Sequence, residues 1–342
     1  MDMYQWLNQQ ISERNKKAMP LLSYPSVQFL FVTVKELVSD SRIMAMGMRL
    51  IADRYKMPFA TSYMDLSVEA EAFGATTIYK PDAVPTIMGK IVETQEEADA
   101  LQVPEVGAGR TGECVEGIRK ALMLISDRPV FANCTGPFSM AGRLMDVNEI
   151  LLQCIEEPEI VHTVLEKCME FSLKYIKALK AAGAHGVIMA EPLAGLLSPG
   201  LMQEFSTDYV KRIVNEVQDK NFLVAYHNCA NAIETKIAEV ADTGCRLFHF
   251  GDKADMVKLL ENLPKDCIVM GNISPSGVFN CDSTRKVRLD TQRLLLQCMN
   301  YDNFIISSGC DIPADTDLDN IDKFFETVEL GYYKRMLWDT VS

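Results

Sequence analysis

Short runs of hydrophobic and β-branched residues recur along the chain and alternate with longer segments in which apolar residues follow helical spacing. We predict eight strands, at residues 20–24, 60–66, 129–134, 186–191, 222–229, 246–251, 267–273 and 304–310. Strands that alternate with helices are typical of a parallel sheet, because each parallel strand needs a crossover to return to the same edge. The pattern therefore predicts an α/β fold.

The predicted helices lie between these strands. They cover residues 36–56, 112–126, two segments across 146–182, then 199–219, 231–242, 253–263, 284–299 and 318–336, after an N-terminal helix at about 3–17. Eight strands in one continuous series favour a closed (β/α)₈ barrel over an open doubly wound sheet. No GxxxxGK[ST] phosphate loop is present in the sequence, which agrees with that choice.

One segment is longer than a single crossover helix requires. Residues 67–111 separate the second and third predicted strands, and TTIYKPDAVPTIMGKIV within them predicts a hairpin that is a candidate lid. No internal repeat, low-complexity tract or long linker points to a second domain. We therefore predict one barrel domain over residues 1–342, with the N-terminal helix inside residues 1–19 and the insertion at 67–111.

Composition narrows the classes of partner. Hydrophobic residues make up 48% of the chain, charged residues 24%, and the formal net charge is -13, which disfavours binding to a phosphate backbone. The N-terminus has no basic start followed by an apolar run, and the apolar stretches are too short for a membrane span, so a cytoplasmic protein is expected. The ten cysteines contain no close CxxC pair and are expected to be reduced thiols.

Polar residues gather where the predicted strands end. In a (β/α)₈ barrel the active site lies at the carboxyl ends of the strands, so these residues are the candidates for chemistry. They are Asp65, Asn133, Thr135, Glu191, His227, Asn272, Ser274, Asp311, His249, Cys229 and Cys310.

Three of these candidates could bind a metal. His227 and Cys229 share one face of a strand, because side chains at i and i+2 point the same way, and Cys310 ends the last predicted strand. Three nitrogen and sulfur ligands leave one tetrahedral position open, which distinguishes catalytic zinc from structural zinc. The competing interpretation is a buried histidine beside two packed cysteines, and the strands that carry these residues are not neighbours.

A family resemblance follows from longer segments. HNCANAIETKIAEVADTGCRLFHF, VMGNISPSG and SSGCDIPADTDLDNIDKFFE resemble the H-x-C…GN-[IV]…GC pattern of methylcobamide:coenzyme M methyltransferases and related corrinoid-dependent proteins on the uroporphyrinogen decarboxylase fold. FANCTGPFSMAGRLM, IMAEPLAGLLSPGLMQEF and MDLSVEAEAFGA are similar to further segments of that family. The resemblance runs from about residue 60 to the C-terminus.

The resemblance implies roles for individual residues. His227, Cys229 and Cys310 match the zinc ligands of the methyltransferases, and Asp65 matches the aspartate that contacts substrate pyrroles in the decarboxylases. Glu191 stands where the methyltransferases often have aspartate. We expect Asp65 and Glu191 to be catalytic; the alternatives for Glu191 are that it orients a substrate or a neighbouring histidine, or that it is only a solvated acid at the end of a strand. Thr135, Asn272 and Ser274 are expected to line the substrate pocket.

The favoured function is zinc-dependent movement of a methyl group between a corrinoid such as methylcobalamin, carried by a corrinoid-binding partner protein, and a thiol or small methylated substrate. A partner is expected because the chain has no corrinoid-binding D-x-H-x-x-G motif. One alternative is a decarboxylase of a cyclic or aromatic acid, and another is a non-catalytic binder of corrinoid or thiol cargo. The stretch MPLLSYPSVQFL lacks the arginines that bind uroporphyrinogen carboxylates in the decarboxylases, which argues against that substrate.

Overall fold

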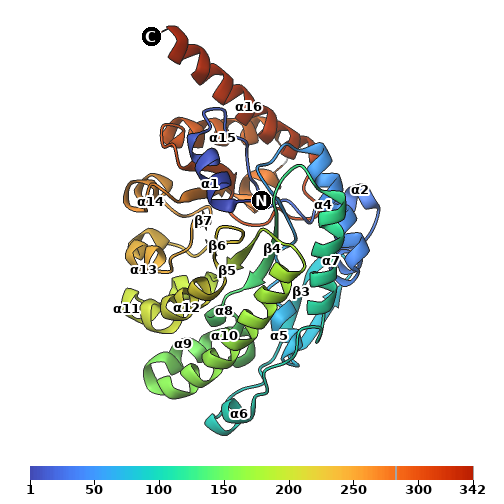
Figure 1. The fold of residues 1–342 in the computed structure, drawn as a ribbon, viewed down its shortest axis with the longest axis vertical. Helices are drawn as coiled ribbons and strands as arrows, with labels where there is room; N and C mark the ends of the chain where they lie inside the picture. Colours follow the sequence, from blue (N-terminus) through green and yellow to red (C-terminus); the bar gives the residue numbers. More distant parts are fainter. Residues whose placement is uncertain (282, 342) are drawn as a thin grey trace.

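A parallel sheet of seven strands forms the centre of the computed structural model, which describes residues 1–281 and 283–341, with side chains as far as residue 333. The strands, in their order across the sheet, are β1 (Ala60–Thr61), β4 (Val130–Thr135), β5 (Gly186–Ala190), β6 (Leu223–Asn228), β7 (Leu247–Phe250), β8 (Ile268–Ile273) and β9 (Phe304–Ser308). The sheet is curled, and helices lie around its outside (Figure 1). All the carboxyl ends therefore open toward one end of the molecule.

Burial explains the composition of the central strands. Every residue of β5 (GVIMA) and of β6 (LVAYHN) is buried. A parallel strand covered on both faces needs apolar residues in succession, and the sequence supplies them. His227 and Asn228 at the end of β6 are polar, yet they are as buried as the apolar residues. They therefore need hydrogen-bond partners inside the protein.

The predicted first strand, residues 20–24, is not a strand of the described sheet. This segment runs between β9 and β1, where Met19 donates its N–H to Ile306 O (2.9 Å) and the Ser23 hydroxyl donates to Thr61 O (3.1 Å). Pro20 has no N–H, and the N–H of Leu21 donates to the side-chain hydroxyl of Ser308 (2.9 Å) instead of to a backbone carbonyl. The α/β class and the parallel sheet are thus confirmed, whereas the prediction of eight strands in a closed barrel is corrected to seven strands.

Most helices match the predicted segments. They are α1 (Met3–Ser12), α2 (Ser26–Leu30), α3 (Val34–Ser39), α4 (Ser41–Arg54), α5 (Val68–Ala72), α6 (Gln95–Ala100), α7 (Thr111–Leu124), α8 (Pro137–Met145), α9 (Val147–Glu156), α10 (Pro158–Ala181), α11 (Pro199–Met202), α12 (Asp208–Val217), α13 (Ile237–Asp242), α14 (Met256–Asn262), α15 (Thr284–Cys298) and α16 (Leu318–Val341). Short 3₁₀ turns lie at Pro192–Leu196 and Ile233–Thr235, and π-type turns lie at Gln203–Thr207 and Pro275–Phe279. Within the described residues, none of these helices has the length and apolar character of a membrane span.

Several helical segments differ from the prediction, and the short helices α2, α5 and α6 lie outside the predicted segments. The helix expected at 36–56 is divided at Asp40, which ends α3 and accepts the N–H of Arg42 (2.7 Å) at the start of α4. Helix α8 was not predicted, although Pro137 occupies its first turn, where proline is favoured. Because α8 begins directly after β4, it lies at the carboxyl end of the sheet, where the candidate site residues are.

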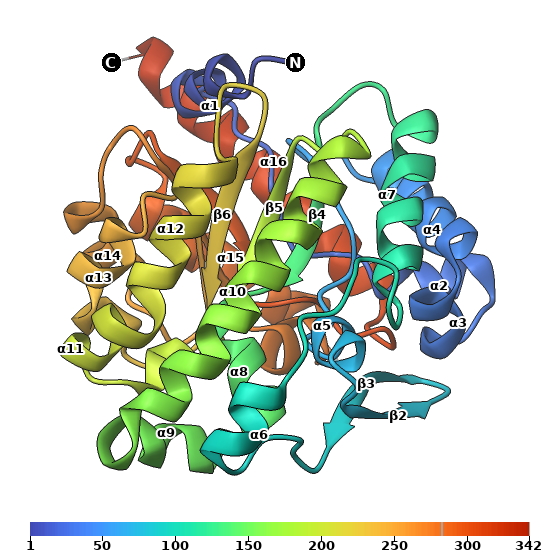
Figure 2. The ribbon, with the colours of Figure 1, turned by 60° about the horizontal axis from the view of Figure 1, so that its bottom comes forward.

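The two ends of the sheet are covered differently. At the amino ends, α1 donates the N–H of Met3 to Lys220 O (2.6 Å), and Trp6 packs on Phe59 and Phe131 with ring centroids 6.0 and 6.2 Å away. The predicted hairpin is present at the opposite end as antiparallel β2 (Thr76–Lys80) and β3 (Ala83–Met88), as Figure 2 shows. Its role as a lid stays a prediction.

The tight packing between central strands can be tested at Gly186. A Cβ atom there would lie 2.3 Å from Cε1 of Phe131 and 2.5 Å from Leu223 O, on the two strands that flank β5. Gly186→Ala should therefore lower the free energy of unfolding by about 1–3 kcal/mol, as overpacking does. Gly200→Ala is the matched control, because no atom lies within 4 Å of its added Cβ, and its effect should stay within about 0.5 kcal/mol in denaturant unfolding. Equal stability of the two variants would contradict this packing.

Candidate metal centre

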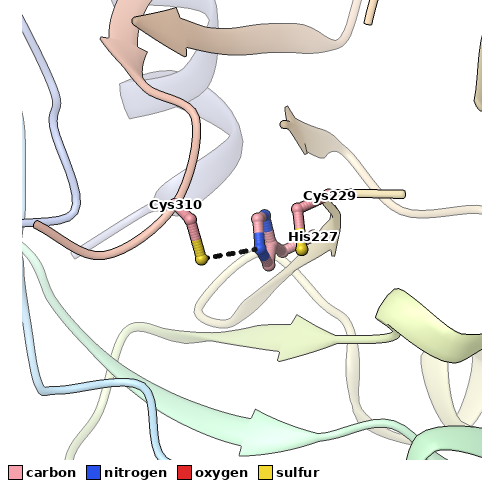
Figure 3. Close-up of side chains that lie close together, drawn as sticks. All are labelled: His227, Cys229 and Cys310. Carbon is pink, nitrogen blue, oxygen red and sulfur yellow. Dashed lines mark hydrogen bonds between the residues drawn. The ribbon is translucent and has the colours of Figure 1, made fainter. Parts of the chain in front are cut away.

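Three potential ligands meet at the carboxyl end of the sheet. His227 lies near the end of β6, Cys229 follows that strand, and Cys310 lies two residues beyond β9. Their ligand atoms all lie within 4.8 Å of one another, and Cys310 Sγ is 3.7 Å from His227 Nε2 (Figure 3). Strands β7 and β8 separate β6 from β9 in the sheet, so it is the curl of the sheet that brings these residues together.

The donor set fits zinc, and so does the distance between the donor atoms of Cys310 and His227. Tetrahedral zinc with Zn–S of about 2.3 Å and Zn–N of about 2.0 Å places its donor atoms about 3.6 Å apart. The 3.7 Å between Cys310 Sγ and His227 Nε2 is close to this value. One imidazole and two thiols are also ligands that zinc prefers, and a fourth position would stay open for another ligand.

Two glycines allow the ligand-bearing segments to approach their neighbours. A Cβ atom on Gly251, directly after β7, would lie 2.6 Å from Cα of Cys229. On Gly309, directly before Cys310, it would lie 2.5 Å from the backbone nitrogen of Asp252. A side chain at either position would push apart the loops that place the two sulfur atoms.

The two thiols share charge unequally. The hydrogen bond with Cys310, followed by the interaction with His227, holds the pKa of Cys229 well below that of an ordinary thiol. The same hydrogen bond, together with burial, raises the pKa of Cys310. By contrast, burial raises the pKa of Cys134 and of Cys245, which lie elsewhere in the core. The opposite shifts favour the thiolate form of Cys229, which is the form that binds metal.

A chain of hydrogen bonds extends from His227 on the side away from the thiols. Its Nδ1 lies 2.7 Å from Nδ1 of His249, the residue paired with it on β7. Nε2 of His249 lies 2.8 Å from the hydroxyl of Ser307, which donates to Met19 O (2.6 Å). His227, His249 and Ser307 are at most 1% exposed. The imidazole of His227 is therefore held from behind by groups that are themselves fixed.

Asp65 lies in a buried ion-pair network. Its side chain is inaccessible to solvent, and it contacts Arg110 (2.6 Å) and the hydroxyl of Ser67 (2.6 Å). Arg110 also pairs with Glu71 (2.6 Å) and lies over the ring of Tyr79. The carboxylate of Asp65 is thus neutralised by a guanidinium group of the same chain, and its predicted catalytic role stays a prediction.

Glu191 holds the start of α8. Its carboxylate accepts the N–H groups of Phe138 (2.7 Å) and Ser139 (3.0 Å) and the hydroxyl of Ser139 (2.9 Å). Burial raises the pKa of Glu191 to about 7 against the effect of these hydrogen bonds. The residue is fully buried, and a Cβ atom on Gly136 would lie 2.3 Å from it. These contacts are those of a helix cap, and catalysis by Glu191 stays a prediction.

The predicted substrate-binding residues also contact the protein itself. Thr135 donates its hydroxyl to Glu69 (2.8 Å), and Ser274 Oγ accepts the N–H of Gly277 (3.1 Å). Asn272 donates to Gly251 O (2.9 Å) and to Ala254 O (2.8 Å), and so fixes the loop that contacts Cys229. Their role in binding a substrate stays a prediction.

Residue-level reasoning from the sequence missed the partners in this region. Arg110 lies in the loop before α7, away from the strand ends that were searched, and no local pattern links it to Asp65. His249 was recognised as a strand-end residue, but its contact with His227 depends on the register between β6 and β7. A search for polar residues at equal distances from the ends of adjacent strands would have paired the two histidines.

Comparisons with known proteins identify the family of this chain. The family model described as uroporphyrinogen decarboxylase (URO-D) matches residues 26–330. The methylcobamide:CoM methyltransferase MtbA of Methanosarcina mazei is 24% identical over 271 residues, which cover 77% of this chain and 76% of that protein. A uroporphyrinogen decarboxylase of Paraburkholderia phytofirmans is 22% identical over 292 residues, covering 81% and 78%.

The fold has a solved counterpart. A methyltransferase from Methanosarcina mazei superposes with a TM-score of 0.83 at 19% sequence identity, covering 97% of this chain and 99% of the other. At this identity the likeness establishes the fold. The curated relatives are enzymes, and they include both methyltransferases and decarboxylases.

The capping role of Glu191 can be tested by its removal. Glu191→Ala leaves two backbone N–H groups and one hydroxyl at the start of α8 without their acceptor, so the free energy of unfolding should fall by about 1–3 kcal/mol. Glu166→Ala is the control, since the exposed pair of Glu166 with Arg212 should contribute at most about 1 kcal/mol. Denaturant unfolding measures both variants. An unchanged stability in Glu191→Ala, together with lost turnover, would instead favour a catalytic role.

Proposed function

The chain belongs to the uroporphyrinogen decarboxylase family, and we propose that within this family it is a zinc-dependent methyltransferase. The proposed reaction moves a methyl group between a corrinoid, carried by a partner protein, and a thiol or a small methylated substrate. The observation that carries the proposal is the convergence of His227, Cys229 and Cys310, whose ligand atoms lie within 4.8 Å of one another.

The donor set explains why zinc is proposed. Three ligands with one open position are the arrangement of catalytic zinc, and a bound zinc ion would supply Lewis acidity that keeps a substrate thiol as thiolate at neutral pH. The chain's own residues prepare the site for this. Cys229 is already biased toward the thiolate, and His227 directs Nε2 toward Cys310.

The corrinoid partner and the thiol substrate are proposed from the relatives. MtbA proteins of Methanosarcina mazei and Methanosarcina acetivorans are described as methylcobamide:CoM methyltransferases, and each is 24% identical to this chain. The sequence contains no D-x-H-x-x-G motif of its own for corrinoid binding. We therefore propose that the methylated corrinoid reaches the centre on a separate protein.

Two observations support methyl transfer over decarboxylation. The segment MPLLSYPSVQFL lacks the arginines that a porphyrinogen with several carboxylates would require. Both oxygens of the Asp65 carboxylate are also occupied, one by Arg110 and the other by the N–H and hydroxyl of Ser67. Three of the roughly four acceptor sites of this carboxylate are therefore taken by the protein itself, which leaves less capacity for substrate N–H groups.

The metal content tests the proposal directly. Anaerobically purified protein should contain about one zinc ion per chain, measured by elemental analysis, and should transfer methyl groups from methylcobalamin to a thiol. Cys229→Ala and Cys310→Ala should each lose the metal and the activity, because two remaining ligands rarely hold zinc against a chelator. Both variants should stay folded, since both cysteines lie beyond the ends of the strands.

Cys245→Ala is the matched control. Cys245 is buried in the core just before β7 and belongs to no cluster of ligands among the described residues, so this variant should keep both zinc and activity. Full zinc retention in Cys310→Ala would contradict the ligand assignment. Loss of carbon dioxide from uroporphyrinogen in the presence of the wild-type protein would favour the decarboxylase alternative.

A further inference from the structure

We propose that His249 is a positioning residue that holds His227 in the tautomer with its proton on Nδ1, so that the lone pair of Nε2 faces the two thiols. The proposal rests on the metal site of the proposed function and deepens it, because it explains what orients the one nitrogen ligand. It depends on three hydrogen bonds in sequence, which join Met19, Ser307, His249 and His227.

The donor and the acceptor in each of these hydrogen bonds follow from the last bond, between Ser307 and Met19. The oxygen of Met19 is a backbone carbonyl and can only accept, so the hydroxyl of Ser307, 2.6 Å away, must donate its single proton there. The oxygen of Ser307 is then left with lone pairs only. It can therefore act only as an acceptor toward Nε2 of His249, which lies 2.8 Å away.

The same reasoning determines which ring nitrogen of His249 carries the proton. Because Nε2 of His249 carries the proton that goes to Ser307, a neutral ring has its lone pair on Nδ1. The ring is completely buried, and its hydrogen-bond partners among the described residues include no carboxylate that a second ring proton could pair with. Nδ1 of His249 then accepts a hydrogen bond from the N–H at Nδ1 of His227, with 2.7 Å between the two nitrogen atoms.

The consequence appears at His227. With its proton committed to Nδ1, the neutral imidazole presents an unprotonated Nε2, 3.7 Å from Cys310 Sγ. A metal can bind this nitrogen without first displacing a proton or rotating the ring. Replacing a group that orients a ligating histidine in this way typically lowers the metal affinity by about 10–100-fold.

The geometry also excludes two other roles for His249. Both of its ring nitrogens are engaged, one by His227 and the other by Ser307, so it has no nitrogen left to be a fourth ligand. The chain ends at the carbonyl of Met19, which cannot pass a proton onward, so the chain is not a route for releasing protons. Its effect should therefore appear in metal binding.

The test compares two substitutions of His249. His249→Leu removes the acceptor for Nδ1–H of His227 and should lower zinc affinity by about 10–100-fold in competition with a chromogenic chelator. His249→Asn keeps an oxygen acceptor near the position of Nδ1 and should bind zinc within about 5-fold of the wild type, well inside the loss expected for the leucine variant. The visible spectrum of the cobalt(II)-substituted protein gives a second readout, since a misplaced imidazole should change its ligand-field bands in the leucine variant alone.

A second variant leaves both rings in place. In Ser307→Ala, His249 loses the hydroxyl as an acceptor and keeps a backbone hydrogen bond with Ser308, so the preference that places the proton of His227 on Nδ1 is weakened. Zinc affinity should therefore fall here too. Ser308→Ala is the matched control, since that hydroxyl accepts the N–H of Leu21 and has no hydrogen bond to His249. His185→Leu controls for loss of an imidazole that accepts the N–H of Val130 at the amino ends of the strands.

These results separate the inference from the proposed function. Wild-type affinity in both His249→Leu and Ser307→Ala would overturn the positioning role, and so would equal losses in the leucine and asparagine variants, which would indicate packing alone. Should His249→Leu fail to fold, Ser307→Ala decides the question by the same measurement. Zinc affinity and the cobalt spectrum are read without turnover, so an absence of methyl transfer by the wild-type protein would contradict the function and leave this test intact.

Discussion

Burial of polar side chains at the carboxyl end of the sheet is the constraint on which the candidate site depends. Asp65, Glu69, Glu191, His227 and His249 are all nearly or fully buried. A buried polar group without a partner costs about 1–3 kcal/mol, so each of these side chains has to be matched from a neighbouring element. The first two acids are matched by Arg110 and Thr135, and Glu191 is matched by the start of α8. The same requirement that stabilises the fold thus fixes the geometry around the centre.

After these polar groups have found partners, the groups that remain available are one imidazole nitrogen and two thiols. The acids are neutralised or capped, and Nδ1 of His227 is committed to His249. Nε2 of His227 and the two sulfur atoms make contacts mainly with one another. Uncommitted soft donors surrounded by satisfied groups are what a metal requires, because the neighbouring side chains then do not compete for its ligands. Function within a shared fold therefore depends on which strand-end groups are left free, and not on the sheet itself.

The sequence predicted the elements that local patterns determine. Central strands such as β5 and β6 begin and end within about one residue of their predicted bounds, because full burial demands uninterrupted apolar runs there. Residues 20–24 carry a similar apolar pattern, but they do not pair as a regular strand. Pro20 has no N–H to donate, and the N–H of Leu21 donates to the hydroxyl of Ser308. The apolar pattern indicates that a segment is buried, but it does not indicate whether the backbone of that segment pairs with a neighbouring strand.

Contacts between distant segments were harder to predict. His227, Cys229 and Cys310 were grouped from residue type and a family resemblance, and the structure brings their ligand atoms together. Asp65 and Glu191 were expected to be available for chemistry, yet Arg110 and the N–H groups of α8 occupy them. Arg110 lies 45 residues after Asp65 in an irregular loop, so its approach depends on tertiary packing that no local spacing encodes.

The difference in burial among the three ligands indicates how a substrate would approach. His227 is 1% exposed and lies with its back to His249, whereas Cys229 and Cys310 are both partly exposed. A metal held by these three atoms would therefore have protein behind its nitrogen ligand and solvent on the side of its sulfur ligands. A group that enters from solvent would have to approach from the side of the two sulfur atoms, since the pair of imidazole rings is buried. This side lies at the carboxyl end of the sheet, which is also the end of the molecule where the hairpin of β2 and β3 lies (Figure 2).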